Sequence, residues 1–269
     1  MSTNKFTEDS YEQTLISLFK ELGYQYECGY DVERDYRLPY HASDLREALQ
    51  RLNPMLSAEV LNEAFRLVTN INEGTLEQRN EQLMDYLQSG VEVKYSEDGR
   101  SKTALVRLID FENPQRNSFV VRNQWRVVEY EPIRCDMVVF INGLPLVVIE
   151  LKSPSREETD EEDAYTQIKQ YQQKCPSLFV YNAFNVTSDM LMTQAGTITA
   201  KRNRYMEWKS VDGKRETTEI ADYDTFFNGI FQKQRLIDIL QNFECFDHKD
   251  GRMAKIKAKI GRASCRERV

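Results

Sequence analysis

The stretch covering residues 134–152, RCDMVVFINGLPLVVIELK, constrains the fold more than any other part of the chain. Two apolar runs flank Asn142-Gly143, and an Asn-Gly pair between such runs is the strongest short-range signal for a β-hairpin. The carboxylate of Asp136 opens the first run, and the triplet from Glu150 to Lys152 closes the second. Because alternate strand residues share a face, Glu150 and Lys152 are expected on one side of the hairpin. The sequence therefore predicts a hairpin with charged groups at its open end.

The length of the turn decides whether the two carboxylates meet. A two-residue loop pairs residue 141 with residue 144 and places Asp136 opposite Ile149. A three-residue loop pairs residue 141 with residue 145 and places Asp136 directly opposite Glu150. A type I turn followed by a glycine bulge produces the longer loop, and we predict it here.

Two carboxylates that face each other on an apolar hairpin repel, and their burial is costly unless a cation is present. Oxygen ligands on a rigid scaffold suit Mg²⁺, which keeps several waters and binds phosphate oxygens. A neighbouring lysine such as Lys152 can stabilise charge on an attacked phosphate or orient the attacking water. The combination predicts a phosphodiesterase site, whereas a bare Glu-x-Lys triplet would most often be only an ion pair at a strand end, since short charged triplets recur by chance.

The spacing of these residues carries a family resemblance. Asp136, thirteen intervening residues, Glu150, one residue and Lys152 resemble the PD-(D/E)xK nuclease motif, although Cys135 stands where a proline often precedes the aspartate. More narrowly, NSFVVRNQ at 117–124, the hairpin with the Ser-Pro that follows it, and QIKQY resemble the N-terminal nuclease domain of the R subunit of type I restriction–modification enzymes. The likeness runs from about residue 11 to residue 257.

The resemblance implies an α/β (α+β) fold of the restriction-endonuclease type, with a mixed central sheet flanked by helices, over residues 1–259. Asp136 and Glu150 would be catalytic ligands of Mg²⁺, joined by the carbonyl of Leu151. Lys152 would assist the attack of water on a phosphodiester of double-stranded DNA.

Residues implied to support the site lie on two predicted helices. Ser10 to Gln13 resemble a capping box, which would place Glu12 in the first turn, where an acid complements the helix dipole. The resemblance makes Glu12 a candidate third carboxylate. On a helix predicted at 164–174, Gln167 and Tyr171 are four residues apart and share a face. They match the family's Q-x-x-x-Y element beside the metal, although an amphipathic helix with a tyrosine at the core edge would give the same pattern.

The remaining segments predict scaffold. Residues 43–89 indicate an insertion of three helices with N-caps at Ser43, Ser57 and Thr75. From residue 91, four successive β runs ending in the hairpin predict an antiparallel meander. A further strand is expected at 178–187, parallel to the second hairpin strand.

Two further stretches could contact nucleic acid. The basic residues Lys201, Arg202 and Arg204 could bind phosphates, or could form an ordinary exposed turn. The tyrosine-rich segment 24–40 could stack on bases, but its acids would repel phosphate, which favours a packed surface loop.

Composition limits the partners. With 269 residues and a formal charge of −7, the chain is not expected to coat DNA by bulk charge. Five scattered cysteines fit free thiols in a reducing compartment. No apolar run has the length of a membrane span, and no signal-peptide pattern opens the chain, so we predict a cytoplasmic protein without a membrane partner. The last ten residues, IGRASCRERV, read like a translated sequencing adapter and are set apart as a non-native tail, 260–269.

The type I resemblance also implies partners. It predicts a restriction endonuclease subunit that acts with methyltransferase and specificity subunits, and whose ATP would bind only to a C-terminal motor absent from this chain. The alternatives are a free-standing repair or defence nuclease of the same fold, and an inactive module that binds DNA or a partner.

Overall fold

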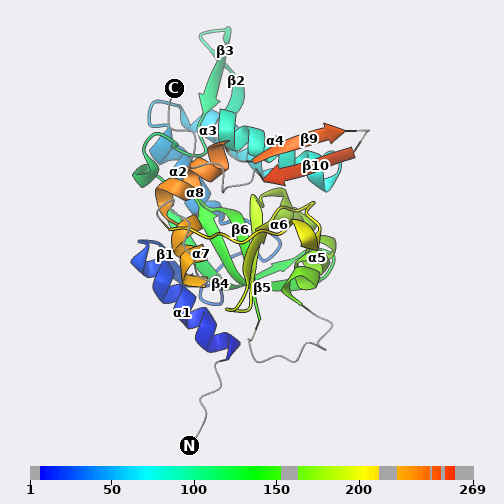
Figure 1. The fold of residues 1–269 in the computed structure, drawn as a ribbon. Helices are drawn as coiled ribbons and strands as arrows, with labels where there is room; N and C mark the ends of the chain where they lie inside the picture. Colours follow the sequence, from blue (N-terminus) through cyan, green and yellow to red (C-terminus); the bar gives the residue numbers. More distant parts are fainter. Residues whose placement is uncertain (1–6, 153–162, 212–222, 243, 250–251, 258–269) are drawn as a thin grey trace, which may run out of the picture.

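A six-stranded mixed sheet forms the centre of the molecule in the computed structural model, which describes residues 7–152, 163–211, 223–242, 244–249 and 252–257 (Figure 1). The strand order is β1-β4-β5-β6-β7-β8. β1 pairs with β4, and β6 with β7, in parallel, while the other neighbours are antiparallel. The strands are Gln25–Cys28 (β1), Phe119–Val128 (β4), Pro132–Ile141 (β5), Leu144–Leu151 (β6), Phe184–Ser188 (β7) and Thr193–Gly196 (β8).

Helices cover both faces of this sheet (Figure 1). The apolar cluster on one face joins Val148 and Phe140 to side chains of α5 and α6. The larger cluster on the other face joins β4–β7 to the remaining long helices. The bounds are Glu8–Glu21 (α1), Ala42–Leu52 (α2), Ala58–Thr69 (α3), Leu76–Ser89 (α4), Ala164–Lys174 (α5), Pro176–Val180 (α6), Tyr223–Ile230 (α7) and Lys233–Asn242 (α8). This mixed sheet between helices confirms the predicted restriction-endonuclease-like fold class.

The predicted three-helix insertion is confirmed as α2, α3 and α4. Ser57 caps α3 through Val60 N–H, and Thr75 forms a capping box with Gln78 at the start of α4. The prediction of Ser43 as the first N-cap is wrong, because His41 occupies that position and its side chain makes no capping bond.

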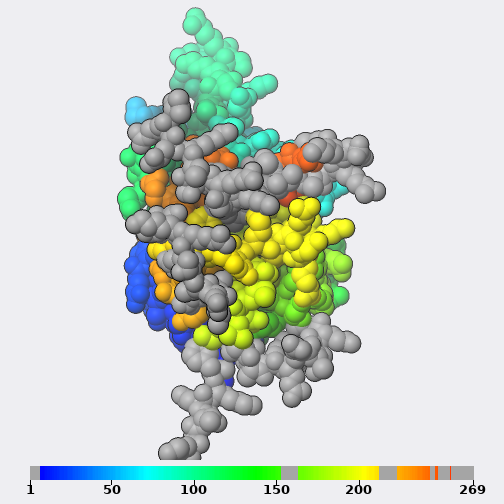
Figure 2. Space-filling model, in the orientation of Figure 1, coloured from blue at the N-terminus to red at the C-terminus, as the bar shows by residue number. Residues whose placement is uncertain are grey.

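The predicted four-run meander is wrong in its first half. β2 (Val91–Glu97) and β3 (Arg100–Val106) pair only with each other, in a separate hairpin that projects from the body at the top of Figure 2. Val91 and Val93 are buried, and β2 packs against α3 rather than beside β4. Because Val91 and Val93 are already buried against α3, the hairpin buries its apolar face without joining the central sheet.

Two further boundaries differ from the prediction. The segment 178–187 is not one strand, because Pro176 opens the short helix α6 and β7 begins only at Phe184, although β7 is parallel to β6 as predicted. Within the segment predicted as a loop, Gln25–Cys28 forms the edge strand β1.

Short elements complete the described chain. Two 3₁₀ turns, η1 and η2, and a second small hairpin lie outside the central sheet. Their bounds are Pro114–Arg116 (η1), Arg202–Arg204 (η2), Glu244–Lys249 (β9) and Arg252–Lys257 (β10). None of the described helices combines the length and apolar character needed to cross a bilayer. The predicted tail, 260–269, lies outside the described residues.

Candidate active site

The β5–β6 hairpin brings the two carboxylates together by a different route from the predicted one. Ile141 pairs with Leu144, so the turn has two residues, and Asn142 and Gly143 both have positive φ (53° and 80°). This is the geometry of a type I′ turn, and the predicted three-residue loop is therefore wrong.

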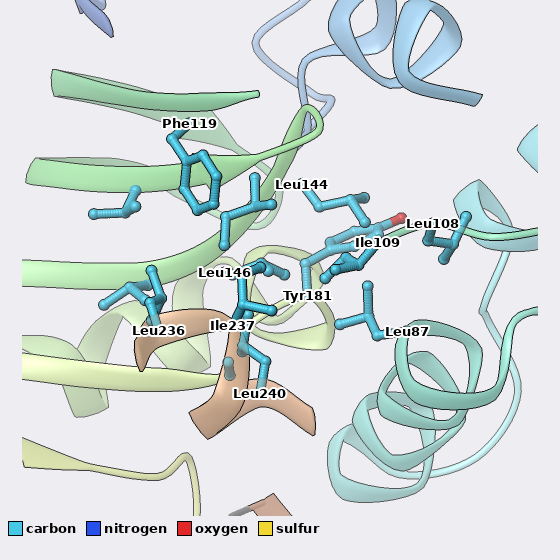
Figure 3. Packing of buried hydrophobic residues seen from close by; sticks show 14 of the residues in the cluster. Leu87, Leu108, Ile109, Phe119, Leu144, Leu146, Tyr181, Leu236, Ile237 and Leu240 are labelled. Carbon is cyan, nitrogen blue, oxygen red and sulfur yellow. The ribbon is translucent and has the colours of Figure 1, made fainter. Parts of the chain in front are cut away.

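A bulge then restores the predicted register. The pairing shifts between Val139 and Phe140, leaving Leu146 as the extra residue of β6, and continues with Met137 opposite Ile149. One step further, Asp136 stands opposite Glu150. Figure 3 shows Leu144 and Leu146 packed among side chains of α4 and α8, so the bulged strand is held within the large core.

Asp136 and Glu150 form a buried pair. Asp136 is 9% exposed and Glu150 fully buried, and the register of β5 and β6 places the two residues opposite each other. Asp136 Oδ2 also accepts a 2.8 Å hydrogen bond from the backbone N–H of Leu151. Glu150 Oε2 is buried without any hydrogen-bond partner. Two acids with one unsatisfied oxygen are the arrangement that a bound cation would stabilise.

The electrostatics of the pair reflect its burial. Loss of solvent raises the pKa of Asp136 from 3.8 to about 6, against the lowering effect of the Leu151 hydrogen bond. Burial, and then the charge of Asp136, raise the pKa of Glu150 well above its ordinary value. Lys152 acts in the opposite direction on both acids. Without a cation, the pair therefore retains protons at a pH where exposed carboxyls have lost them.

Lys152 lies beside the pair and is held by helix α5. Its Nζ donates to Glu150 Oε1 at 3.1 Å and to Gln167 Oε1. Gln167 Nε2 in turn donates to the Tyr171 hydroxyl at 2.5 Å, and that hydroxyl donates to the backbone carbonyl of Arg134 at 2.7 Å. The shared face predicted for Gln167 and Tyr171 is confirmed. This chain of hydrogen bonds joins the lysine that directly follows β6 to the strand that carries Asp136.

Glu12 is near this end of the sheet but turned toward β4. The N-cap of α1 is Thr7, which forms a capping box with Ser10, so the helix begins a turn earlier than predicted and Glu12 does not lie in its first turn. Its carboxylate accepts hydrogen bonds from Asn123 Nδ2 (2.6 Å) and Gln124 Nε2 (2.7 Å).

The residues that Glu12 binds form an irregularity in β4. Gln124 has φ +49°, a left-handed conformation unusual for a non-glycine residue inside a strand. The pairs on either side of it, Asn123 with Met137 and Trp125 with Cys135, place Gln124 across from Asp136. Glu12 therefore reaches the site through the strand beside the aspartate.

The sequence analysis did not single out Glu8, an acid of α1 whose charge affects Asp136. The charge of Glu8, in the first helical turn, raises the pKa of Asp136. The spacing Glu8-x-x-x-Glu12, one helical turn, was the available signal.

The pair offers a defined set of oxygens to a metal ion. Because the N–H and C=O of one strand residue point to the same side, the carbonyl of Leu151 faces the same side as its N–H, toward Asp136. Among the residues that the structure describes, no group of three or more His, Cys, Asp or Glu side chains could hold a metal. Two carboxylates and one carbonyl, with water in the other positions, fit the chemistry of Mg²⁺.

The predicted basic patch is exposed, and part of it is already paired. Arg202 forms an ion pair with Asp163, the N-cap of α5, and lies 5.2 Å from the ring centre of Tyr165. Arg204 is exposed in the turn η2, and Lys201 is exposed directly before it. The patch borders the first turn of the helix that carries Gln167.

The mixed sheet between helices belongs to the restriction-endonuclease-like class of folds. A family model described as the type I restriction enzyme R protein N terminus matches residues 5–204, and the chain belongs to that family.

Relatives cover most of the chain. The HindI endonuclease subunit of Haemophilus influenzae is 32% identical over 253 residues, covering 89% of this chain and 24% of the relative. A putative MjaIXP endonuclease subunit of Methanocaldococcus jannaschii is 33% identical, covering 88% and 25% respectively. The EcoprrI endonuclease subunit of Escherichia coli is 30% identical, covering 76% and 65%. The chain thus spans about a quarter of the length of the first two relatives.

Proposed function

We propose that this chain is the DNA-cleaving domain of a type I restriction enzyme R subunit, and that it hydrolyses phosphodiester bonds with the help of Mg²⁺. The observation that carries the proposal is the buried Asp136–Glu150 pair with Lys152 beside it. The names of the relatives support the same activity, since each is an endonuclease subunit of a type I restriction enzyme.

Each side chain has a separate task in this proposal. Asp136, Glu150 and the carbonyl of Leu151 hold the ion. When bound, Mg²⁺ polarises a phosphoryl oxygen and makes a coordinated water more acidic. The ion would also remove the cost of leaving Glu150 Oε2 without a partner.

Lys152 acts on the phosphate. Its ammonium group can donate a hydrogen bond to a phosphoryl oxygen that gains negative charge as water attacks. Gln167 fixes the lysine in place, and Tyr171 fixes Gln167, so both are positioning residues. A flexible lysine would lose much of this effect because it would have to be ordered during the reaction.

The wider assembly is part of the proposal. Methyltransferase and specificity subunits would select the DNA, and ATP would act through a motor further along the complete polypeptide. The residues described here would supply cleavage without reading the base sequence.

The test pairs cleavage with metal binding. We expect Asp136→Asn and Lys152→Met each to lower cleavage of double-stranded DNA by about 10²–10³-fold, because removal of one electrostatic group costs this much at comparable sites. Asp136→Asn should also weaken Mn²⁺ binding in calorimetry, while Lys152→Met should not. The matched controls are Glu63→Gln and Lys102→Met, which change exposed ion pairs on α3 and β3. The proposal is wrong if Asp136→Asn cuts DNA at the wild-type rate in the assembled enzyme.

A further inference from the structure

Two arginines lie directly opposite each other on β4 and β5. The register pairs Arg126 with Arg134, so both side chains leave the same face of the sheet. Residues in such positions have Cβ atoms about 5 Å apart, and like charges there destabilise a sheet. Both residues are exposed. A like-charged pair at this spacing does nothing for the stability of the sheet and requires another explanation.

Neither Arg126 nor Arg134 takes part in an ion pair among the described residues. The hydrogen bond with Tyr30 raises the pKa of Arg134, and the charge of Asp136, in the site itself, has a smaller effect in the same direction. Two other acids are engaged elsewhere. Asp35 pairs with Arg37, and Glu131 with Lys174. The positive charge of the pair is therefore available to a ligand.

Each arginine is instead positioned by a tyrosine of the 29–40 segment. The guanidinium of Arg126 lies 5.4 Å from the ring centre of Tyr36, and Arg134 Nη1 donates to the Tyr30 hydroxyl at 2.9 Å. Both tyrosines are exposed. Aromatic rings and hydroxyls orient guanidinium groups without cancelling their charge, so the pair is ordered and remains cationic.

Arg134 is close to Asp136 along the chain. Arg134 is two residues before Asp136 on β5, a separation of about 6.6 Å along a strand. Its backbone carbonyl accepts the hydrogen bond from Tyr171 that completes the Lys152–Gln167 chain. The position of Arg134 is thus fixed by the same contacts that order the site.

We propose that Arg126 and Arg134, oriented by Tyr36 and Tyr30, bind a phosphate of the DNA backbone beside the phosphate that is cleaved. The inference rests on the function proposed above and adds a residue set for holding the DNA strand. Two guanidinium groups side by side match the oxygens of a phosphodiester, and phosphate contacts of this kind fix the position of a protein on DNA without reading its sequence.

The test measures binding separately from cleavage. A duplex of defined length is titrated with the chain in Ca²⁺ at several salt concentrations, comparing wild type with Arg126→Gln/Arg134→Gln. We expect at least about tenfold weaker binding and a salt slope shallower by about 0.9 for the lost phosphate contact. The control, Arg66→Gln/Arg100→Gln, removes the same charge from α3 and β3 and should leave the slope unchanged. The conservative variant Arg126→Lys/Arg134→Lys should retain most of the slope.

Three results would overturn the inference. One is a slope and affinity of the glutamine variant equal to those of the control. Another is wild-type binding that does not depend on salt. The third is a lysine variant with unchanged Mn²⁺ stoichiometry whose slope is as shallow as that of the glutamine variant, because the positive charges would then not be what binds the phosphate. Failure of the proposed function would look different, since Asp136→Asn would then leave cleavage unchanged whatever the arginine variants do to binding. Mn²⁺ binding by the glutamine variant should keep its stoichiometry, which shows that the acids remain folded.

Discussion

At the turn of the β5–β6 hairpin, Asn142 is fully buried and its amide is fully bonded. Its Nδ2 donates to the Leu108 carbonyl and to Asn117 Oδ1, and its Oδ1 accepts from Arg51 and Ser118. At the open end of the same hairpin, Glu150 is equally buried, but one of its oxygens has no partner and its neighbour is another acid. One end stabilises the fold, whereas the other keeps an unfavourable pair for which a cation is the natural partner.

The largest expected effect is at the turn. Gly143→Ala should lower the free energy of unfolding by about 3–5 kcal/mol, because a Cβ would lie 2.5 Å from Leu45 N and 2.7 Å from the His41 carbonyl at φ +80°. Urea unfolding measures the loss. The control is Gly99→Ala in the β2–β3 turn, at φ +74° with nothing within 4 Å, where only backbone strain of about 1 kcal/mol applies. Equal losses for the two variants would show that the turn end is not tightly packed.

At the open end of the hairpin, a substitution of Asp136 should stabilise the protein, in contrast to the loss expected at the turn. Without divalent ions, Asp136→Asn should raise the free energy of unfolding at pH 8 by about 2–3 kcal/mol, from a shift of roughly two pKa units. The pKa of Asp136 is raised from 3.8 to about 6, so the folded wild type is favoured below pH 4 and loses this stability as the pH rises to 6. The asparagine variant lacks that loss.

Urea unfolding at pH 4, 6 and 8 measures whether Asp136→Asn raises or lowers the free energy of unfolding. The difference between the variant and the wild type should grow from pH 4 to pH 6, as Asp136 ionises in the wild type. A variant less stable than wild type at pH 8 would contradict the view of a strained pair.

A substitution of Glu12 tests whether its carboxylate stabilises the fold through its hydrogen bonds to β4 or belongs to the unfavourable pair of acids. Glu12→Gln should lower the free energy of unfolding by about 1–2 kcal/mol, because its two oxygens accept from Asn123 and Gln124 and an amide can satisfy only one of these donors. If Glu12 instead belonged to the strained pair, the same substitution would stabilise the protein. The unfolding free energy in the absence of metal distinguishes the two outcomes.

The smallest effect concerns Tyr171. Tyr171→Phe removes the hydroxyl that bonds Gln167 and the Arg134 carbonyl, and should cost about 1 kcal/mol of stability and up to tenfold in cleavage. Tyr181→Phe, which loses a buried hydroxyl bonded to the Val68 carbonyl, should cost similar stability with no effect on cleavage. Equal cleavage by the two variants would remove Tyr171 from the positioning chain.

The hairpin also shows what sequence could predict. The sequence correctly predicted that Asp136 stands opposite Glu150. The reason given was wrong, because the extra residue is Leu146 in β6 and not a third residue in the turn. Asn142-Gly143 is the preferred pair for a two-residue type I′ turn, and Pro145, which has no N–H for a ladder, was the signal for a nearby irregularity. Both signals are local and could have been combined.

Other errors came from contacts distant in sequence. Whether β2 and β3 join the main sheet depends on α3, and whether Gln25–Cys28 forms a strand depends on a parallel partner nearly a hundred residues away. The left-handed Gln124 has no sequence signal of its own, because its conformation is held by Glu12 and by the close approach of Gly29, whose N–H donates to the Asn123 carbonyl. These features require the folded neighbours to be known.

Helix α5 holds two strands of the site through a single pair of side chains. Gln167 accepts a hydrogen bond from Lys152, directly after β6, while Tyr171 donates to the backbone of β5 close to Asp136. A shift of α5 by one ångström would lengthen both contacts at once, so the amine and the aspartate would lose their alignment together. The alignment of the amine with the aspartate therefore depends on the placement of a single helix.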